Sequence, residues 1–526
     1  MTYEETVADM VHANMRKWPE RVMATFETGE RWTWADAFQI GATGARALRA
    51  HGLDENSHVG ILLENGPDWF RAYFSISLLG GTVVPFLPAH QGAVLADMLR
   101  RSDCKAIITS ENLRDRLSSI SGDVQVLTAP DLQAAAAGSD DWTGLPDRGG
   151  WDLHALLFTS GTTGPSKAVE VSNHYLLHVG DWWRTKSLGI ELDQDDAFLC
   201  DLPLAHMGGL AACLQMMRIG GRIDVRTRPD LRNYWSVARA TGSTFSILLS
   251  SMVDFVISQP PSVDDCNHKL RAALVVPLMQ DPPAFVERFG IEHVVTVYAM
   301  TEVGTPLVRA ASWDVPERSC GQLLPGIEGR IVDDHDVELP VNTPGELLLR
   351  RSDPWKNTTG YYGGDKASRA LTRNGWLHTG DILSVDEEGN YFFHDRGKDY
   401  LRRRGENVSS FEVEREALAH PAVLEAACVG VQDEDGSDEI KIFLVTAPDH
   451  TIDAPLLLEF LSARMAHFMV PRFYEFVPAL PRTDTGRVKK VDLRSAPHGD
   501  SSWDLVAAGY RLTRAGLTRP SQALDT

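Results

Sequence analysis

Short apolar runs alternate with amphipathic stretches through roughly the first 300 residues of this chain, and this alternation limits the folds that it can adopt. Residues 59–63, for example, form an apolar run that is followed by a helical pattern over residues 68–79. Alternation of this kind is typical of α/β layers with mostly parallel sheets. From Gly326 onward the runs are shorter and are separated by Gly, Asp and Pro turns, which predicts a small β-rich subdomain. The other predicted strands lie at residues 104–109, 124–127, 198–202, 222–225, 245–249, 274–276, 294–297, 328–332, 345–349, 382–385 and 391–394.

Length and a change in charge density predict more than one domain. A chain of 526 residues is too long for a single hydrophobic core. Residues 395–405 are dense in charged side chains, as a linker would be. The elements expected after this linker are helices near 410–419 and 454–467 and strands near 426–431 and 441–445. We therefore expect a large N-terminal domain at residues 1–395, a small α+β domain at 396–498 and a loosely ordered tail at 499–526 with one candidate helix at 505–512.

Charge, cysteine spacing and the distribution of apolar residues argue against a nucleic-acid partner, a disulfide framework and a membrane span. Lys and Arg number 51 against 72 Asp and Glu, so the net charge of −21 argues against nucleic acid as a general partner. Six cysteines without any C-x-x-C pair indicate reduced, buried thiols in a cytoplasmic protein. The acidic N-terminus does not resemble a signal peptide, and no run of about 18 apolar residues predicts a membrane span.

One loop points to a polyphosphate ligand. It follows the apolar run at residues 153–158 and contains Thr159, Ser160, Gly161, Thr162, Thr163, Gly164 and Lys167. Glycines let the backbone approach a ligand closely, and successive backbone N–H groups with hydroxyls form an anion-binding concavity. The loop is not a Walker A motif, because two residues separate Gly164 from Lys167. A loop of this composition can also be an ordinary surface turn.

The same loop closely resembles the phosphate loop of the adenylate-forming superfamily, which contains acyl-CoA synthetases, peptide-synthetase adenylation domains and luciferases. The resemblance extends over roughly residues 5–495 and is nearest to acyl-CoA ligases of the crotonobetaine/carnitine–CoA ligase type, which it also matches around residues 260–262 and 269–271. It implies a large N-terminal AMP-binding domain, a mobile C-terminal domain, and ATP and Mg²⁺ at the site.

Further motifs of the large domain match the superfamily. Tyr298-Ala299-Met300-Thr301-Glu302 resembles its Y-G-M-T-E motif, with Ala299 in place of glycine. The resemblance implies that Thr301 contacts the α-phosphate and that Glu302 coordinates Mg²⁺, a cation that usually takes one or two carboxylates together with phosphate oxygens. Asp381 stands in a motif whose Asp accepts hydrogen bonds from the ribose. Arg396 matches an arginine that contacts ribose or phosphate.

The resemblance also assigns roles in and around the C-terminal domain. Lys398 corresponds to the hinge about which that domain turns. Gly405 begins a Gly-Glu-Asn-Val segment that resembles the one lining the pantetheine channel of coenzyme A ligases. Arg487 occupies the position of the family's catalytic lysine. Arginine keeps the positive charge but is planar and bulkier, so the exchange leaves open an active variant, a changed acid or slower adenylation, or the use of Lys489 instead.

Two further departures concern the pockets for the acid and for adenine. His206 resembles a histidine that shapes the acyl pocket, but Ala205 replaces the usual aromatic residue before it. Residues 275–279 lack the family's G-G-A-P pattern, so adenine contacts do not carry over to them. The acyl pocket is expected near Trp182 and Trp183 and at residues 202–206, 248–252 and 275–298, whose apolar content indicates an organic acid with apolar or aromatic parts.

These resemblances imply an ATP-dependent ligase. A small-molecule acid would form an acyl adenylate with release of pyrophosphate, and the acyl group would pass to coenzyme A. One alternative is a ligase with another acceptor, either an amide-forming enzyme or a nitrite-activating diazotase acting on an aryl amine. The second alternative is a catalytically silent nucleotide-binding homologue.

Overall fold

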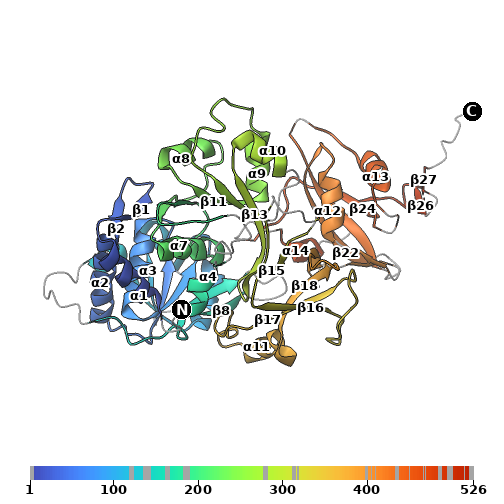
Figure 1. Ribbon diagram of the computed structural model, residues 1–526. Helices are drawn as coiled ribbons and strands as arrows, with labels where there is room; N and C mark the ends of the chain where they lie inside the picture. The colour runs from blue at the N-terminus through green and yellow to red at the C-terminus, as the bar shows by residue number, and fades with distance from the viewer. Residues whose placement is uncertain are drawn as a thin grey trace, which may run out of the picture.

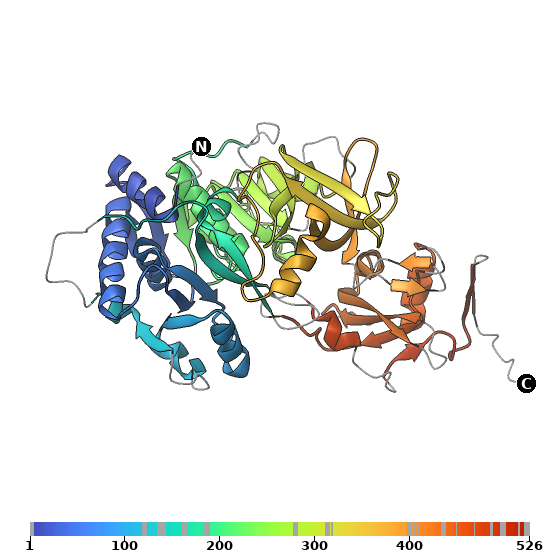
Figure 2. The ribbon, with the colours of Figure 1, turned by 90° about the horizontal axis from the view of Figure 1, so that it is seen from below.

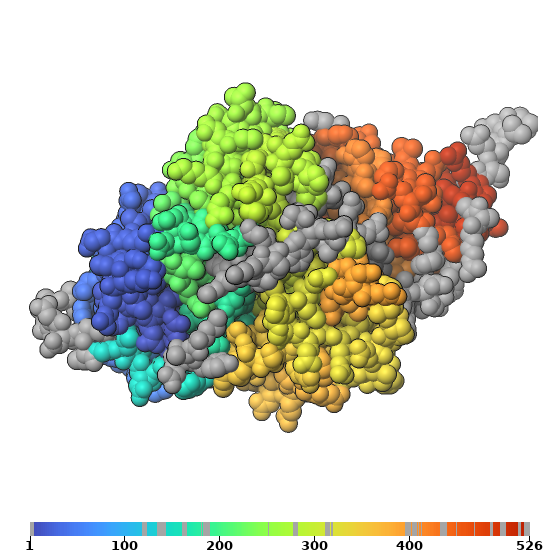
Figure 3. Space-filling view, viewed as in Figure 1, coloured from blue at the N-terminus to red at the C-terminus, as the bar shows by residue number. Residues whose placement is uncertain are grey.

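The computed structural model divides into a large part and a smaller C-terminal lobe. Figures 1 and 2 both show the elements from α12 to β27 at one end of the molecule and the N-terminal helices at the other. In the space-filling view the C-terminal lobe, orange to red, stands beside the remainder (Figure 3). The structure describes residues 5–117, 124–133, 144–159, 166–179, 181, 190–276, 282–310, 316, 319–396, 401–403, 406–408, 410–432, 438–448, 450–465, 467, 469–483, 488–494, 501–513 and 516–519.

The first sheet of the large part has six strands in the order β6-β5-β3-β4-β7-β8. Every neighbouring pair is parallel except β7 and β8, which are antiparallel. The strands are β3 (His58–Leu62), β4 (Thr82–Phe86), β5 (Cys104–Thr109), β6 (Gln125–Thr128), β7 (Leu153–Thr159) and β8 (Lys167–Ser172). Thr159 and Lys167 are partners in the β7–β8 register, so the last residue of one strand faces the first residue of the other.

The second sheet has nine strands in the order β15-β14-β13-β12-β11-β9-β10-β1-β2. Its five central pairs, from β13 to β1, are parallel, and the pairs at both margins are antiparallel. The strands are β1 (Val22–Phe26), β2 (Arg31–Thr33), β9 (Ala197–Cys200), β10 (Arg222–Val225), β11 (Phe245–Leu249), β12 (Ala272–Val276), β13 (His293–Met300), β14 (Gly304–Ala310) and β15 (Gln322–Leu323). The carboxyl ends of β9, β11, β12 and β13 therefore lie along one edge.

Helices α3 (Pro67–Leu79) and α7 (Met207–Ile219) lie in a core shared by the two sheets. Both are buried on nearly all sides, as expected for helices that are apolar all round. Each ends at a glycine in the left-handed conformation, Gly80 and Gly220. The other helices of the large part are α1 (Val7–Lys17), α2 (Trp34–Ala50), α4 (Gly92–Arg101), α5 (Ala129–Gln133), α6 (Asn173–His178), α8 (Tyr234–Thr241), α9 (Ser250–Ser258), α10 (Pro282–Phe289) and α11 (Asp365–Leu371), with 3₁₀ turns at Glu111–Leu117 and Arg373–Gly375.

The predicted β-rich subdomain is confirmed. It is a four-stranded antiparallel sheet of β16 (Ile327–Val332), β17 (Gly345–Arg351), β18 (Leu377–Val385) and β19 (Tyr391–Arg396). Together with the two larger sheets it makes up the large α/β part of the expected fold class.

The C-terminal lobe has a hydrophobic core of its own. Its sheet runs β22 (Val423–Gln432), β23 (Asp438–Thr446), β24 (Phe473–Phe476) and β25 (Trp503–Asp504), and its helices are α12 (Ser410–Leu418), α13 (Ala454–Ser462) and α14 (Lys490–Arg494). A short hairpin of β20 (Leu401–Arg403) and β21 (Glu406–Val408) precedes α12, and Leu401 belongs to the C-terminal core. These elements match the expected small α+β domain, although α13 ends earlier than predicted.

The helix predicted at residues 505–512 is wrong, and the segment around it is not loose. Trp503 of β25 pairs with Tyr474 of β24, and the two rings lie 5.5 Å apart. Asp504 forms an ion pair of 3.0 Å with Arg472. Gly509 at φ +82° reverses the chain before β26 (Arg511–Thr513) and β27 (Gly516–Thr518). Residues 505–509 therefore form turns, and residues 511–513 form a strand of a short hairpin in place of the predicted helix.

The cysteine prediction is only partly confirmed. All six cysteines are free thiols, and Cys104, Cys200, Cys213 and Cys428 are buried as expected. Cys266 is exposed, contrary to the expectation, and it lies in the loop between α9 and β12. None of the helices in the described ranges has the length and apolar character needed to cross a bilayer.

A buried carboxyl group makes the stability of the fold depend on pH. Asp201 follows β9, is 3% exposed, and its Oδ1 has no hydrogen-bond partner among the described residues. Burial raises the pKa of this carboxyl to about 7, although the nearby charge of Arg226 opposes the shift. The folded state therefore favours the protonated form more than the unfolded chain does. The contribution of Asp201 to the free energy of unfolding is fully present below pH ~4. It decreases as pH rises through ~7, by up to about 4 kcal/mol in total.

Replacing Asp201 by its neutral isostere is expected to remove this loss. The melting temperature of Asp201→Asn should exceed that of wild type by a margin that widens by several degrees between pH ~5 and ~8. Scanning fluorimetry at both pH values measures the margin. Asp147→Asn, at an exposed position, is the matched control and should show no such widening. An equal margin for Asp201→Asn at both pH values would contradict the prediction.

Candidate active site

The stem of the predicted phosphate loop is held beside a tyrosine from a distant part of the chain. Thr159 ends β7 and Lys167 begins β8, in register with each other. The Lys167 ammonium lies 4.6 Å from the centroid of the Tyr361 ring, within cation–π distance. Ser160, Gly161, Thr162, Thr163 and Gly164 lie outside the described residues.

The turn between β13 and β14 carries Thr301 and Glu302. Gly304 ends it at φ +73°, and a Cβ there would come within 2.7 Å of Val179, so this position favours glycine. The Tyr175 hydroxyl donates to the Thr301 carbonyl at 2.8 Å. Glu302 is only 8% exposed, and its Oε1 accepts a hydrogen bond of 2.8 Å from the Tyr361 hydroxyl.

A second carboxylate is held in the same way on the β-rich sheet. The Tyr298 hydroxyl, on β13, donates to Asp381 Oδ2 at 2.7 Å, and both residues are buried. Burial, reinforced by the Asp381 charge, raises the pKa of Tyr298 well above its ordinary value, so the phenol stays protonated and remains a donor. On the neighbouring strand Arg396 is the register partner of Asp381. The structure therefore brings Tyr298, Asp381 and the backbone of Arg396 together.

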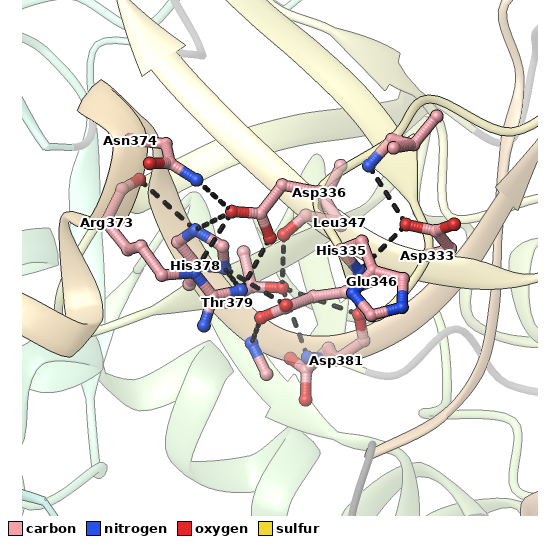
Figure 4. A network of polar contacts seen from close by, with 12 residues as sticks. Asp333, His335, Asp336, Glu346, Leu347, Arg373, Asn374, His378, Thr379 and Asp381 are labelled. Atoms are coloured by element: carbon pink, nitrogen blue, oxygen red, sulfur yellow. Dashed lines mark hydrogen bonds and ion pairs between the residues drawn. The ribbon is translucent and has the colours of Figure 1, made fainter.

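Polar contacts of Glu346, His378 and Thr379 stabilise the part of β18 that carries Asp381 (Figure 4), and we call these contacts the brace. Gly380, at φ +70°, donates its backbone N–H to Glu346 Oε1 at 2.9 Å. The other oxygen of Glu346 lies 3.0 Å from Nδ1 of His378, and the backbone N–H of Asp381 donates to the Thr379 hydroxyl at 3.1 Å. Because the left-handed Gly380 immediately precedes Asp381, these contacts control the direction of the Asp381 carboxylate.

The brace extends to two loop residues in the left-handed region. Asp336 and Asn374 have φ of +63° and +55°, which residues other than glycine adopt uncommonly. Their side chains are hydrogen-bonded to each other, and Arg373 Nε donates to Asp336 at 3.0 Å. Strained residues of this kind persist only where the surrounding contacts hold them. Here the contacts of Asp336 join the loop between β16 and β17 to the 3₁₀ turn that precedes His378.

The remaining predicted residues of the large part stand at the carboxyl edge of the nine-stranded sheet. His206 follows β9 and is the N-cap of α7, where its Nδ1 accepts a hydrogen bond from Gly208 N–H at 3.2 Å. Ala299, exposed, and Met300 form the end of β13. The described parts of the segments expected to line the acyl pocket leave β9, β11 and β12 at the same edge, whereas Trp182, Trp183 and residues 277–281 lie outside the described residues.

Two models of known protein families match this chain. A model of the AMP-binding enzyme family matches residues 11–362, and a model of the AMP-binding enzyme C-terminal domain matches residues 412–487. The first match alone spans about two thirds of the chain. The chain belongs to the AMP-binding enzyme family.

Relatives and solved structures agree with this membership. The crotonobetaine/carnitine–CoA ligase of Proteus mirabilis is 28% identical over 482 residues, which cover 86% of this chain and 90% of the relative. ATP-bound MatB from Rhodopseudomonas palustris superposes with a TM-score of 0.81 at 25% identity, covering 94% of this chain and 98% of MatB. The o-succinylbenzoate coenzyme A synthetase of Bacillus subtilis, solved with ATP and magnesium ion, shares the fold with a TM-score of 0.82 at 23% identity, over 92% and 99% of the two chains.

The family matches include several of the residues that the sequence motifs predict for the site. Thr159, Lys167, Thr301, Glu302 and His206 fall inside the large family match, and Arg487 is the last residue of the C-terminal one. Lys398, Gly405 and Arg487 lie outside the described residues. Tyr361, Tyr175 and Glu346 were not predicted from the sequence. The run of aromatic and glycine residues at 360–364 was the available signal for Tyr361, but nothing in it pointed to Glu302.

The contacts of Glu346 with Gly380 and His378 are expected to control nucleotide affinity. Glu346→Ala removes the acceptor of the Gly380 N–H and the partner of His378, so the Asp381 carboxylate keeps its hydrogen bond to Tyr298 but loses the support of the backbone that carries it. We expect the dissociation constant for AMP to rise about tenfold, since hydrogen bonds to charged groups contribute about 1.5–3 kcal/mol. Isothermal titration calorimetry measures it.

Glu346→Gln and Glu387→Ala complete this experiment. The glutamine retains a carbonyl acceptor and should recover most of the affinity. Glu387 is exposed in the turn between β18 and β19, so its removal should leave AMP binding unchanged. If Glu346→Ala binds AMP as wild type does, the brace has no part in nucleotide binding.

Proposed function

We propose that this chain is an ATP-dependent, AMP-forming ligase that activates a carboxylic acid as an acyl adenylate and transfers it to coenzyme A. The supporting observation is that contacts link three separated motifs. Lys167 of the phosphate-loop motif lies over the Tyr361 ring, and the Tyr361 hydroxyl donates a hydrogen bond to Glu302. Tyr298, of the same motif as Glu302, donates a hydrogen bond to Asp381. The activities that give the crotonobetaine/carnitine–CoA ligase and the o-succinylbenzoate coenzyme A synthetase their names support the same assignment.

In the first step a carboxylate oxygen of the acid attacks the α-phosphorus of ATP, and pyrophosphate leaves. Lys167 and the loop before it hold the phosphates, Thr301 contacts the α-phosphate, and Asp381 accepts hydrogen bonds from the ribose hydroxyls. Arg396 contacts ribose or phosphate. Tyr298, Ala299 and Met300 form the strand end beside the nucleotide. Reactions of this kind depend mainly on positioning and on electrostatic stabilisation.

Glu302 fits a magnesium site. Its carboxylate is buried, one oxygen is occupied by Tyr361, and Oε2 has no hydrogen-bond partner among the described residues. Mg²⁺ is usually bound by one or two carboxylates together with phosphate oxygens. When bound, Mg²⁺ would offset the negative charge of the triphosphate. Arg487 would supply further positive charge near the acid and the α-phosphate.

In the second step the thiol of coenzyme A attacks the acyl carbonyl, and AMP leaves. β19 ends at Arg396 in the β-rich sheet, whereas Leu401 already belongs to the C-terminal core. We therefore keep the domain boundary near residue 396 and assign the hinge to Lys398. Rotation there would bring the segment starting at Gly405 to the site as part of the coenzyme A channel. Both substrates suit the expected cytoplasmic location.

The acid is assigned to the edge formed by the ends of β9, β11, β12 and β13. His206 stands at this edge and shapes the acyl pocket, and Ala205 leaves it wider than the usual aromatic residue would. The described segments there are largely apolar. The substrate class is therefore an organic carboxylic acid with apolar or aromatic parts.

ATP–pyrophosphate exchange over a panel of acids that includes nitrite tests this function. We expect exchange that depends on one class of carboxylic acid, followed by formation of the acyl-CoA thioester when coenzyme A is added. Glu302→Ala should lower the exchange rate about a hundredfold, a typical loss for one group that stabilises developing charge. Arg487→Lys reports whether the arginine slows adenylation relative to lysine.

A control variant and the results that would contradict the proposal complete this test. Glu287→Ala removes an exposed carboxylate on α10 and should leave exchange unchanged. Exchange with nitrite alone, or adenylate transfer only to an amine, would replace the acyl-CoA assignment. ATP binding without exchange for any acid would identify a silent homologue.

A further inference from the structure

A segment between β17 and α11, residues 358–362, ties the Glu302 turn to the strand that follows the phosphate loop. The Thr358 N–H donates to the Glu302 carbonyl at 2.9 Å. The Glu170 N–H donates to the Gly360 carbonyl at 3.0 Å, and the Tyr362 N–H donates to the Ala168 carbonyl at 2.9 Å. We call residues 358–362 the bridging segment, because it is hydrogen-bonded to β8 and to the Glu302 turn at once.

Tyr361 is the member of the bridging segment that reaches both phosphate-site groups. Its backbone pairs with Val169 on β8, two residues beyond Lys167. Its hydroxyl donates to Glu302 Oε1 at 2.8 Å, and the Lys167 ammonium stands over its ring at 4.6 Å. The adjacent Tyr362 points elsewhere and donates its hydroxyl to Asp103 at 2.9 Å.

The two contacts of Tyr361 act on opposite charges. Tyr361 and Glu302 are 9% and 8% exposed, so the carboxylate depends on this donor where little water can reach it. The hydrogen bond occupies Oε1 and directs Oε2 away from the phenol. The electron-rich face of the same ring holds the ammonium of Lys167.

We propose that Tyr361 is a positioning residue that couples cation binding at Glu302 to phosphate binding at Lys167. The ligand is a divalent-cation complex of a nucleoside triphosphate, and its identity as MgATP rests on the proposed function. The hydroxyl serves the cation through Glu302, and the ring serves the phosphates through Lys167. The two parts of the side chain are therefore separable by mutation.

Binding of α,β-methylene-ATP to the full-length protein, measured by calorimetry with and without Mg²⁺, tests the coupling without any turnover. Tyr361→Phe removes only the hydroxyl. The factor by which Mg²⁺ strengthens binding should fall about tenfold, equivalent to about 1.4 kcal/mol. Binding without metal should stay within about twofold of wild type. Tyr361→Leu also removes the ring, so binding without metal should weaken too.

Tyr362→Phe is the matched control, because it removes a neighbouring hydroxyl that contacts only Asp103 among the described residues. It should bind the analogue as wild type does in both conditions. The coupling is overturned if Tyr361→Phe keeps the wild-type response to Mg²⁺, or if it loses affinity equally with and without the metal, which would indicate a merely structural hydroxyl.

Failure of the proposed function can be told apart from failure of this proposal. Wild-type protein that binds the analogue but catalyses no acid-dependent exchange would refute the ligase assignment, and the calorimetry would still decide the role of Tyr361. Wild-type protein that binds no analogue, with or without Mg²⁺, would refute both.

Discussion

The parallel pairing of β9, β11, β12 and β13 determines where the site can lie. Parallel neighbours end at the same edge of a sheet, so residues that are about 100 positions apart in the chain come to one line. His206 leaves this edge from β9, and the Glu302 turn leaves it from β13. The nearly all-apolar helices α3 and α7 keep this sheet packed against the six-stranded sheet, which carries Thr159 and Lys167.

Two tyrosines attach the remaining charged groups to this frame. Tyr298 links β13 to Asp381 on the β-rich sheet, and Tyr361 links the bridging segment to Glu302. A buried carboxylate is costly unless it is hydrogen-bonded, and a buried phenol holds its proton tightly enough to remain a donor. Each pair therefore satisfies both partners while it fixes the distance between two parts of the chain.

The sequence predicted the elements of the site that depend on consecutive residues. Thr159 and Lys167 pair at the ends of β7 and β8, Tyr298 lies near the end of β13, and Asp381 accepts a hydrogen bond from Tyr298, while the roles of these residues stay predictions. Tyr361 and Glu346 were missed because their importance comes from contacts with residues 59 and 34 positions away. The prediction of a helix at 505–512 is wrong, since residues 505–509 form turns and residues 511–513 pair with residues 516–518.

By itself, the sequence determined the alternation of strands and helices, the family and the chemical types at the site, because periodicity and short motifs are local properties of the chain. The tertiary structure alone decided which side chain holds which. The direction of the Glu302 carboxylate depends on a phenol brought in by the bridging segment, and the direction of Asp381 depends on the brace at Gly380. Directions of this kind arise only when distant segments are packed together, since hydrogen bonds act over about 3 Å.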